Sequence, residues 1–186
     1  MGQRIPYTRR KFVKAALGAM VVGPTILVAG CQDGDVVDRQ LVFRSLREGL
    51  DEAERLAQAA SVRMNSGWTL SQTLTHCAQS IEYSMTGFPQ MKSPLFQKTA
   101  GAAAFGVFAW RGRMSHNLTE PIPGAPSLQG DADLGASLTR LTRSVQDFEA
   151  SREPLQAHFA YGQLDKSDYE LAHAMHLANH FSMIVA

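Results

Sequence analysis

The last predicted helix of this 186-residue chain carries three histidines on one face. The pattern Ser167-x-x-Glu170 is typical of a capping box and predicts that the helix begins there. At about 100° per residue, the apolar positions form a stripe that leaves His173, His176 and His180 together on the opposite face; the stripe consists of Leu171, Ala174, Met175, Ala178, Phe181 and Val185. Residues four apart are neighbours on a helix, so His176 and His180 can direct two imidazoles at one point. This spacing indicates a metal site that needs a third ligand, although a metal-free helix can carry the same spacing.

Charge is distributed unevenly along the chain. The formal net charge is +1, but the first 30 residues hold five basic residues and no acidic ones: Arg4, Arg9, Arg10, Lys11 and Lys14. Removing these five from the 18 basic residues leaves 13 against 17 acidic residues in the rest of the chain. A mildly acidic body gives no basic face for phosphates, so we expect no nucleic-acid partner.

The N-terminal segment has the pattern of an export signal. The string Thr8-Arg-Arg-Lys-Phe12-Val-Lys14 resembles a twin-arginine signal, and an apolar run, 15–29, follows it. Val28-Ala-Gly-Cys31 resembles a bacterial lipobox, in which the cysteine is acylated. We therefore expect residues 1–30 to be a twin-arginine lipoprotein signal read by the export machinery, with residues 31–40 a tether from membrane lipid. The protein would then lie on the periplasmic side of the cell envelope; a single uncleaved anchor helix is the alternative.

The chain has only two cysteines. If Cys31 carries lipid, Cys77 has no partner and no internal disulfide can form. Stability would then come from the packing of the helices and from a bound metal.

The remainder of the chain is predicted to be all-α. Apolar residues recur at spacings of three and four, and a second capping box, Thr69-x-x-Gln72, marks a helix that Gly87 ends. The other helices are predicted over 41–60, 94–110, from 131 or 133 to about 153, and from 167 onward, with a proline-rich loop over 111–130. Such a loop is long for a compact domain and often covers a binding site.

The second predicted helix offers a candidate for the third ligand. His76 lies in a row of polar residues turned away from the apolar stripe, together with Gln72, Gln79 and Tyr83. Either this row is a solvated surface, or the helix is covered on both sides and the row lines an internal site. In a helical bundle, ligands from facing helices meet in the interior.

An ordered set of motifs resembles one superfamily. The motifs are Trp68-Thr-Leu-Ser-Gln-Thr-Leu-Thr-His76, Gly87-Phe-Pro89, Arg111-Gly-Arg-Met114, His158-Phe-Ala-Tyr-Gly162 and His173-x-x-His176-x-x-x-His180. Over about residues 40–184 they resemble the DinB/YfiT-like metal-binding four-helix bundles, in an uncharacterised branch. The resemblance implies a domain over 41–186, with an extra short helix or long loop. It also implies a divalent metal, zinc or nickel with iron or copper as alternatives, held by His76, His176 and His180. Asn179, where this branch often has histidine, and Cys77, where an aliphatic residue is usual, depart from the pattern.

The other reactive side chains are given separate interpretations. His173 and Tyr83 are candidate catalytic residues, and His173 or His158 is expected either to orient a ligand or to belong to the loop–helix junction. Gln72, Gln79 and Tyr83 line the pocket or make structural hydrogen bonds. His116, in the proline-rich loop, is expected to be solvated. Cys77 points toward the apolar stripe, which favours a buried thiol over a nucleophile.

Three functions compete. The first is a metal-dependent transferase or hydrolase acting on a small molecule, since some members of the superfamily are thiol-dependent S-transferases or isomerases. The second is a non-catalytic metal- or ligand-binding module of the cell envelope, and the third is a structural helical protein without metal. His176 is followed by no glutamate, which excludes the zinc-protease motif with its glutamate base. A homodimer is compatible with each function.

Overall fold

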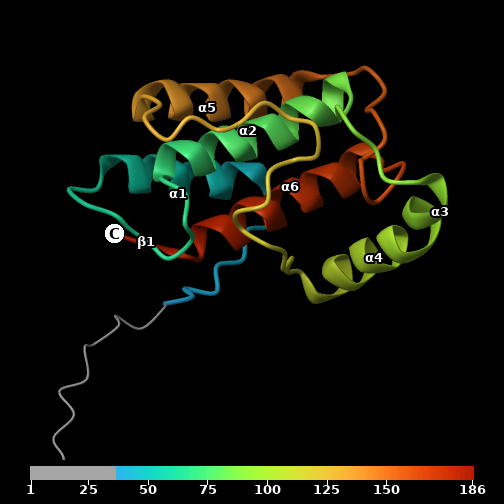
Figure 1. Ribbon diagram of the computed structural model, residues 1–186, viewed down its shortest axis with the longest axis horizontal. Helices are drawn as coiled ribbons and strands as arrows, with labels where there is room; N and C mark the ends of the chain where they lie inside the picture. Colours follow the sequence, from blue (N-terminus) through green and yellow to red (C-terminus); the bar gives the residue numbers. More distant parts are fainter. Residues whose placement is uncertain (1–36) are drawn as a thin grey trace, which may run out of the picture. The chain divides into compact units, whose positions relative to one another are not determined.

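The computed structural model describes residues 37–186 (Figure 1), so the predicted signal, 1–30, and Cys31 lie outside the described residues. All of the described residues belong to one compact unit. The regular structure of the described residues is helical apart from one two-stranded ladder, which confirms the all-α prediction. Among them, no helix is both long and apolar enough to cross a membrane.

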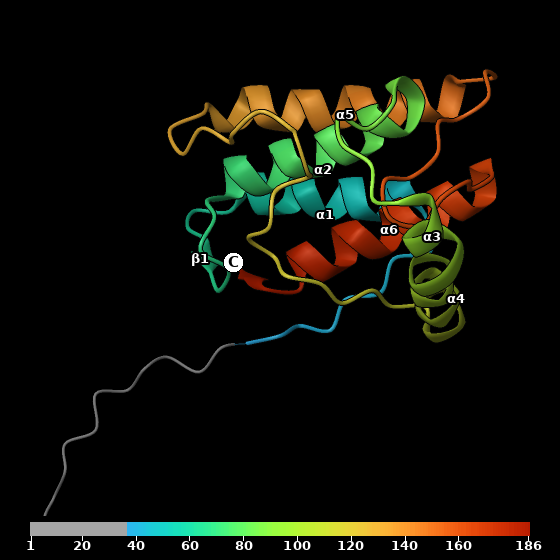
Figure 2. The same cartoon turned by 45° about the vertical axis from the view of Figure 1, so that its right-hand side comes forward.

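Four long helices enclose the core (Figures 1 and 2). α1 packs against α5 and α6, and α2 packs against the same two helices. Their bounds are Leu46–Gln58 for α1, Leu70–Thr86 for α2, Leu134–Ala150 for α5 and Lys166–Phe181 for α6. Each helix contributes large apolar side chains to the core, including Leu50, Leu74, Phe148 and Phe181.

The helices begin where polar side chains cap them. The predicted capping box of α2 is present: Gln72 N–H donates to Thr69 Oγ1, and Thr69 N–H donates to the Gln72 side chain. The predicted capping box of α6 is wrong. Asp165, two residues before Ser167, has an extended backbone and accepts the Asp168 N–H at 2.8 Å, while the Ser167 hydroxyl donates to Asp165 instead.

The first helix is shorter than predicted. It begins after Ser45, whose hydroxyl accepts the Glu48 N–H. The preceding residues are held by the end of α6: Arg39 N–H donates to the Ser182 carbonyl, and Leu41 N–H donates to the Ser182 hydroxyl. Since these backbone groups bond outside the helix, residues 41–45 do not extend α1.

A helical segment, 94–111, lies beside α6 and apart from α1 and α5 (Figure 2). It runs through α3 (Pro94–Phe96), a π-helical stretch η1 (Gln97–Gly101) and α4 (Ala102–Arg111), as the sequence predicted for 94–110. At Gly101 an added Cβ would lie 1.9 Å from the carbonyl oxygen of Ala160. The helix thus touches the connector before α6 through a residue that has no side chain.

The chain after α4 forms the long loop that the sequence predicted, up to Asp133. Its Met114 and Ile122 are buried in the core. The described residues also contain a short antiparallel ladder, which the sequence did not predict: β1 (Arg63–Met64) pairs with β2 (Ile184–Val185). This ladder fixes the C-terminal end of α6 beside the segment that leads into α2.

Candidate metal centre

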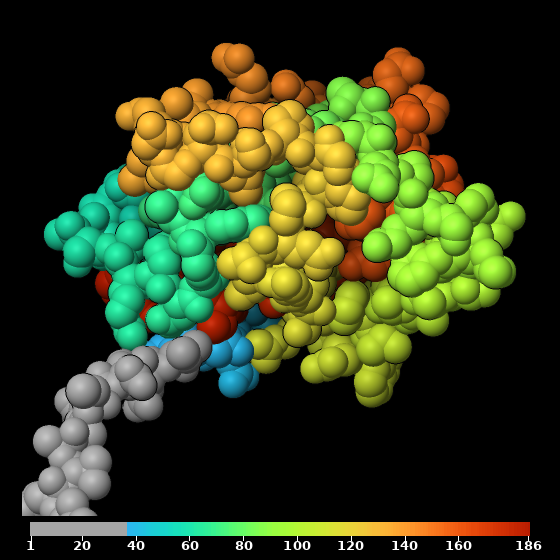
Figure 3. Space-filling view, viewed as in Figure 1, coloured from blue at the N-terminus to red at the C-terminus, as the bar shows by residue number. Residues whose placement is uncertain are grey.

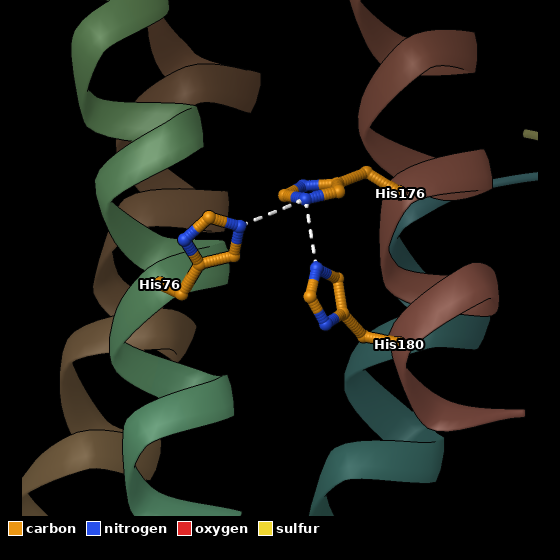
Figure 4. Close-up of side chains that lie close together, drawn as sticks. All are labelled: His76, His176 and His180. Atoms are coloured by element: carbon orange, nitrogen blue, oxygen red, sulfur yellow. Dashed lines mark hydrogen bonds between the residues drawn. The ribbon is translucent and has the colours of Figure 1, made fainter. Parts of the chain in front are cut away.

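Three histidines from two helices converge inside the protein (Figure 4). His76 comes from the middle of α2, and His176 and His180 come from successive turns of α6. The Nε2 atom of His176 lies 3.2 Å from Nε2 of His76 and 3.1 Å from Nε2 of His180. One nitrogen from each of the three residues lies within 4.8 Å of the others. The structure therefore brings together the three residues that the sequence proposed as ligands.

Hydrogen bonding alone does not satisfy this arrangement. Each ring nitrogen has either one proton or one lone pair, so His176 Nε2 can make one normal hydrogen bond to an imidazole and not two. A divalent cation instead accepts a lone pair from all three nitrogens. Metal–nitrogen bonds of about 2.0–2.1 Å in a tetrahedral site separate the nitrogens by about 3.3 Å, close to the two spacings observed. The donor set fits a borderline metal such as zinc, nickel, copper or iron.

The environment keeps these imidazoles neutral. All three side chains are buried, and the most exposed, His176, retains 9% of its surface. Burial, with a smaller contribution from His116, lowers the pKa of His76 to about 3. The pKa values of His176 and His180 also lie well below the ordinary value, because of burial first and the neighbouring imidazoles second. Since only neutral imidazole binds metal, proton competition is weak at neutral pH.

Two further aromatic rings enclose the three histidines. Trp68, just before the α2 cap, lies 4.9 Å from His76 and parallel to His180 at 6.0 Å between ring centroids. His116 lies 5.0 Å from His176 and 5.1 Å from His180. The interpretation of His116 as a solvated residue is therefore wrong. The loop that carries it is held against the core by Met114 before it and Ile122 after it, both of which are buried. Sequence reasoning missed both rings as parts of the site.

A cavity of about 260 Å³ opens beside the three histidines. In Figure 3 a hollow separates the loop after α4 from the segment around α3, and atoms of the connector and α6 are visible within it. Its wall is largely apolar, with Met114, Ile122, Phe159 and Tyr161, while Lys92 and Glu120 supply charge. Such a cavity suits a small molecule with an apolar body.

His173 and His158 both line this cavity. The His173 ring stacks on Tyr169 and meets Phe148 edge-on, and its Nε2 has no hydrogen-bond partner within the described residues. His158 Nδ1 accepts the backbone N–H groups of Ala160 and Tyr161, both at 3.1 Å. The proton of neutral His158 is therefore on Nε2, its only nitrogen available to a ligand as a donor. Burial is the main cause that lowers the pKa of each histidine to about 3.

The other residues that the sequence proposed for the site do not line this cavity. Tyr83 packs against Phe88 and lines a separate pocket with Gln79, and neither residue lines the cavity. Gln72 forms the capping box and donates to the Leu128 carbonyl, a structural role. Cys77 is buried in the core, and burial raises the pKa of its thiol, which agrees with the prediction of an unreactive residue.

The comparison with protein families adds a fact that geometry does not supply. Residues 36–186 match the model of a family described as Protein of unknown function (DUF1569). The chain belongs to the DUF1569 family. The match spans all three convergent histidines, the loop with His116 and the whole lining of the cavity. No curated protein and no solved structure matches the chain.

Proposed function

We propose that this DUF1569 protein is a metal-dependent enzyme, a transferase or hydrolase, that acts on a small molecule in the cavity beside the three histidines. The observation that carries the proposal is the convergence of the Nε2 atoms of His76, His176 and His180 in the interior of the protein. Three imidazoles leave coordination positions open, which is typical of catalytic rather than structural metal sites. A divalent metal bound there supplies Lewis-acid chemistry, polarising a substrate carbonyl or lowering the pKa of a water or thiol.

The residues around the site have distinct roles in this proposal. His76, His176 and His180 hold the metal, and Trp68 packs against two of these rings and keeps water from them. His158, with its proton on Nε2, donates a hydrogen bond to a substrate oxygen. His173 is neutral, lines the cavity and has an Nε2 without a partner within the described residues, so it is placed to hydrogen-bond the substrate.

We also propose a fold class and a cellular location for this protein. The pairing of α1, α2, α5 and α6, with one ligand on α2 and two on α6, supports a DinB-like four-helix bundle with an inserted helix and a long loop. We further propose that the protein is exported through the twin-arginine machinery and lipid-anchored through Cys31 on the periplasmic side, on the basis of its N-terminal motifs.

Elemental analysis of protein purified without a histidine tag tests the metal. We expect about one divalent metal ion per chain in the wild type and none in His176→Ala. Adding a chelator should lower the melting temperature of the wild type. Turnover is then measured against a panel of ester and thiol substrates with metal-loaded protein. Metal content that is far below stoichiometric, or activity that survives in His176→Ala, contradicts the proposal. Tight metal binding with no turnover on any substrate supports a non-catalytic binding module instead.

A further inference from the structure

His116 carries a lone pair beside the three histidines without being one of them. Its Nδ1 lies 2.9 Å from the Asn117 carbonyl oxygen. A carbonyl only accepts, so Nδ1 must be the protonated nitrogen and Nε2 must hold the lone pair. That Nε2 is buried and has no hydrogen-bond partner within the described residues. A buried acceptor without a partner is costly, which points to a missing ligand.

The position of His116 allows its ring to move. It lies on the long loop between α4 and α5, whereas the three convergent histidines lie on helices. The ring borders two cavities, the one beside the three histidines and a second of about 180 Å³ that Ser115 and Asn179 also line. Space on both sides permits the ring to turn toward or away from the three histidines, while the buried Met114 and Ile122 hold the loop backbone against the core.

We propose that His116 is a fourth, exchangeable ligand of the metal, carried on a loop, that occupies an open coordination position and leaves when a substrate binds. This proposal rests on the proposed metal site and adds to it a residue that the metal-ligand set lacks. Exchange of a neutral imidazole for a substrate oxygen or thiolate involves no redox step and no net transfer of protons by His116 itself. The loop then couples occupation of the cavity to the metal.

Cobalt(II) serves as the probe, because its visible absorption reports the number of ligands. Purified apo-protein is titrated with Co²⁺, and the affinity and spectrum of the wild type are compared with His116→Ala, His176→Ala and Ser115→Ala, the last a control for the loop. We expect His116→Ala to bind Co²⁺ at least tenfold more weakly with an altered spectrum, in line with the loss of a group that contacts a metal site. Added imidazole should restore the spectrum.

The outcomes separate the two proposals. Unchanged affinity and spectrum in His116→Ala, with binding lost in His176→Ala, overturns the fourth ligand and leaves the metal site intact. Binding that survives in His176→Ala overturns the metal site itself. Circular dichroism of each variant confirms the fold, and because His116 lies in a loop, its substitution should leave the helices in place.

A second, independent observation concerns the outer face of the segment 94–111. Of the seven large apolar side chains that are exposed in the described chain, five lie on or just before it: Met91, Leu95, Phe96, Val107 and Trp110. Leu95 is 75% and Trp110 86% exposed. Figures 1 and 2 both show α3 and α4 at one side of the molecule. An exposed apolar patch of this kind marks an interaction surface.

The charges around this face identify its partner. No acidic residue occurs between Glu82 and Glu120, while Lys92, Lys98 and Arg111 flank the apolar positions. Two copies of such a face would bring like charges together, whereas anionic lipid headgroups attract them. Arg113, just after α4, pairs with Asp38 at 3.8 Å and so holds the start of the described chain beside this helix. Val37 lies six positions after Cys31, so the chain between them can span at most about 22 Å.

We infer that the exposed face of α3–α4 docks on an anionic lipid bilayer, with Trp110 and Leu95 inserted at the interface. Apolar side chains that insert at the interface and basic side chains that contact anionic headgroups add to each other in binding such a face to a membrane surface. The face would also fix the orientation of the cavity, since Lys92 borders both.

Vesicle binding tests this docking with the chain from Asp35, a compact unit with its own core. In a Trp68→Phe background, Trp110 fluorescence should shift to the blue with phosphatidylglycerol-containing vesicles and not with pure phosphatidylcholine, and high salt should reverse the shift. Leu95→Glu and Trp110→Glu should lower vesicle partitioning at least tenfold, while Val42→Glu, at a 52% exposed site elsewhere, should not. Failure to bind anionic vesicles, or a concentration-dependent dimer that the same two variants dissociate, overturns the proposal.

Discussion

The indole of Trp68 lies parallel to the imidazole of His180, with 4° between the ring planes and 6.0 Å between their centroids. The same indole also meets His76, so a single aromatic residue contacts two of the three proposed ligands. Trp110, the second tryptophan of the chain, is exposed on α4 and does not line the cavity. Trp68 is therefore a natural reporter of metal binding.

We expect Cu²⁺ to quench most of the Trp68 emission. In Trp110→Phe, which leaves Trp68 as the only tryptophan, one equivalent of Cu²⁺ should remove most of the emission, because the metal would lie against rings in contact with the indole. The Trp68→Phe variant should lose little of its signal. Quenching that persists in a Trp110→Phe, His176→Ala double variant would show that the ion binds elsewhere.

Gly101 is predicted to be intolerant of a side chain. A Cβ there would lie 1.9 Å from the Ala160 carbonyl oxygen and 3.0 Å from its carbon, both backbone atoms that cannot rotate away. Forcing extra atoms into packed structure costs about 1–3 kcal/mol, and we expect Gly101→Ala to lie at the upper end. Urea unfolding of the purified protein measures the loss.

Gly106 supplies the matched control. It lies five residues further along the same helical segment, within α4, and an added Cβ meets nothing within 4 Å. Replacing a helical glycine by alanine stabilises by about 0.5–1 kcal/mol. Opposite signs for Gly101→Ala and Gly106→Ala are therefore expected; a shared sign would mean that the contact with Ala160 does not constrain the helix.

The site was predictable where local geometry decides it. His176 and His180 are one turn apart, so helical periodicity alone places their rings together. His76 could be singled out because it lies in a polar row, turned away from the apolar stripe of its helix. His116 could not, because the position of a loop residue depends on tertiary contacts. The buried Met114 and Ile122 on either side of it were the available signal, since apolar residues anchor a loop to the core.

The helix ends, too, were predictable only where the capping residues lie close together in the sequence. Thr69 and Gln72 form the predicted capping box because both partners lie within one turn. Ser167 and Glu170 have the same pattern, but Asp165 is the N-cap of α6, because its carboxylate accepts the Asp168 N–H. The start of α1 depends on Ser182, more than 130 residues away, whose carbonyl and hydroxyl bind the preceding strand-like segment. No local pattern carries that information.

The thiol of Cys77 is predicted to be unreactive in the folded protein. It is 1% exposed, and burial raises its pKa, so little thiolate forms at neutral pH. In the chain from Asp35, where it is the only cysteine, a thiol reagent should modify it at the rate of unfolding, and Cys77→Ala should retain its metal. Rapid modification of native protein would identify an accessible nucleophile instead.

The stability of the metal-free protein should fall as the pH is lowered below about 6.5. Burial holds the pKa values of His158 and His173 near 3, whereas in the unfolded chain they return to about 6.5. Between these values the unfolded chain takes up protons that the folded protein does not, so stability is complete above pH 6.5 and declines toward pH 3. Each such histidine costs up to about 1.4 kcal/mol per pH unit in this window.

Urea unfolding at pH 7, 6 and 5 measures this slope, and His173→Phe provides the control. Phenylalanine keeps the stacking on Tyr169 and the contact with Phe148 but cannot be protonated. In the wild type the free energy of unfolding should fall as the pH is lowered. In the variant this fall should be smaller by up to about 1.4 kcal/mol per pH unit, the contribution of one histidine. A free energy of unfolding that is constant from pH 7 to 5 would show that His158 and His173 take up protons in the folded protein as readily as in the unfolded chain, and would contradict the effect of burial on their pKa values.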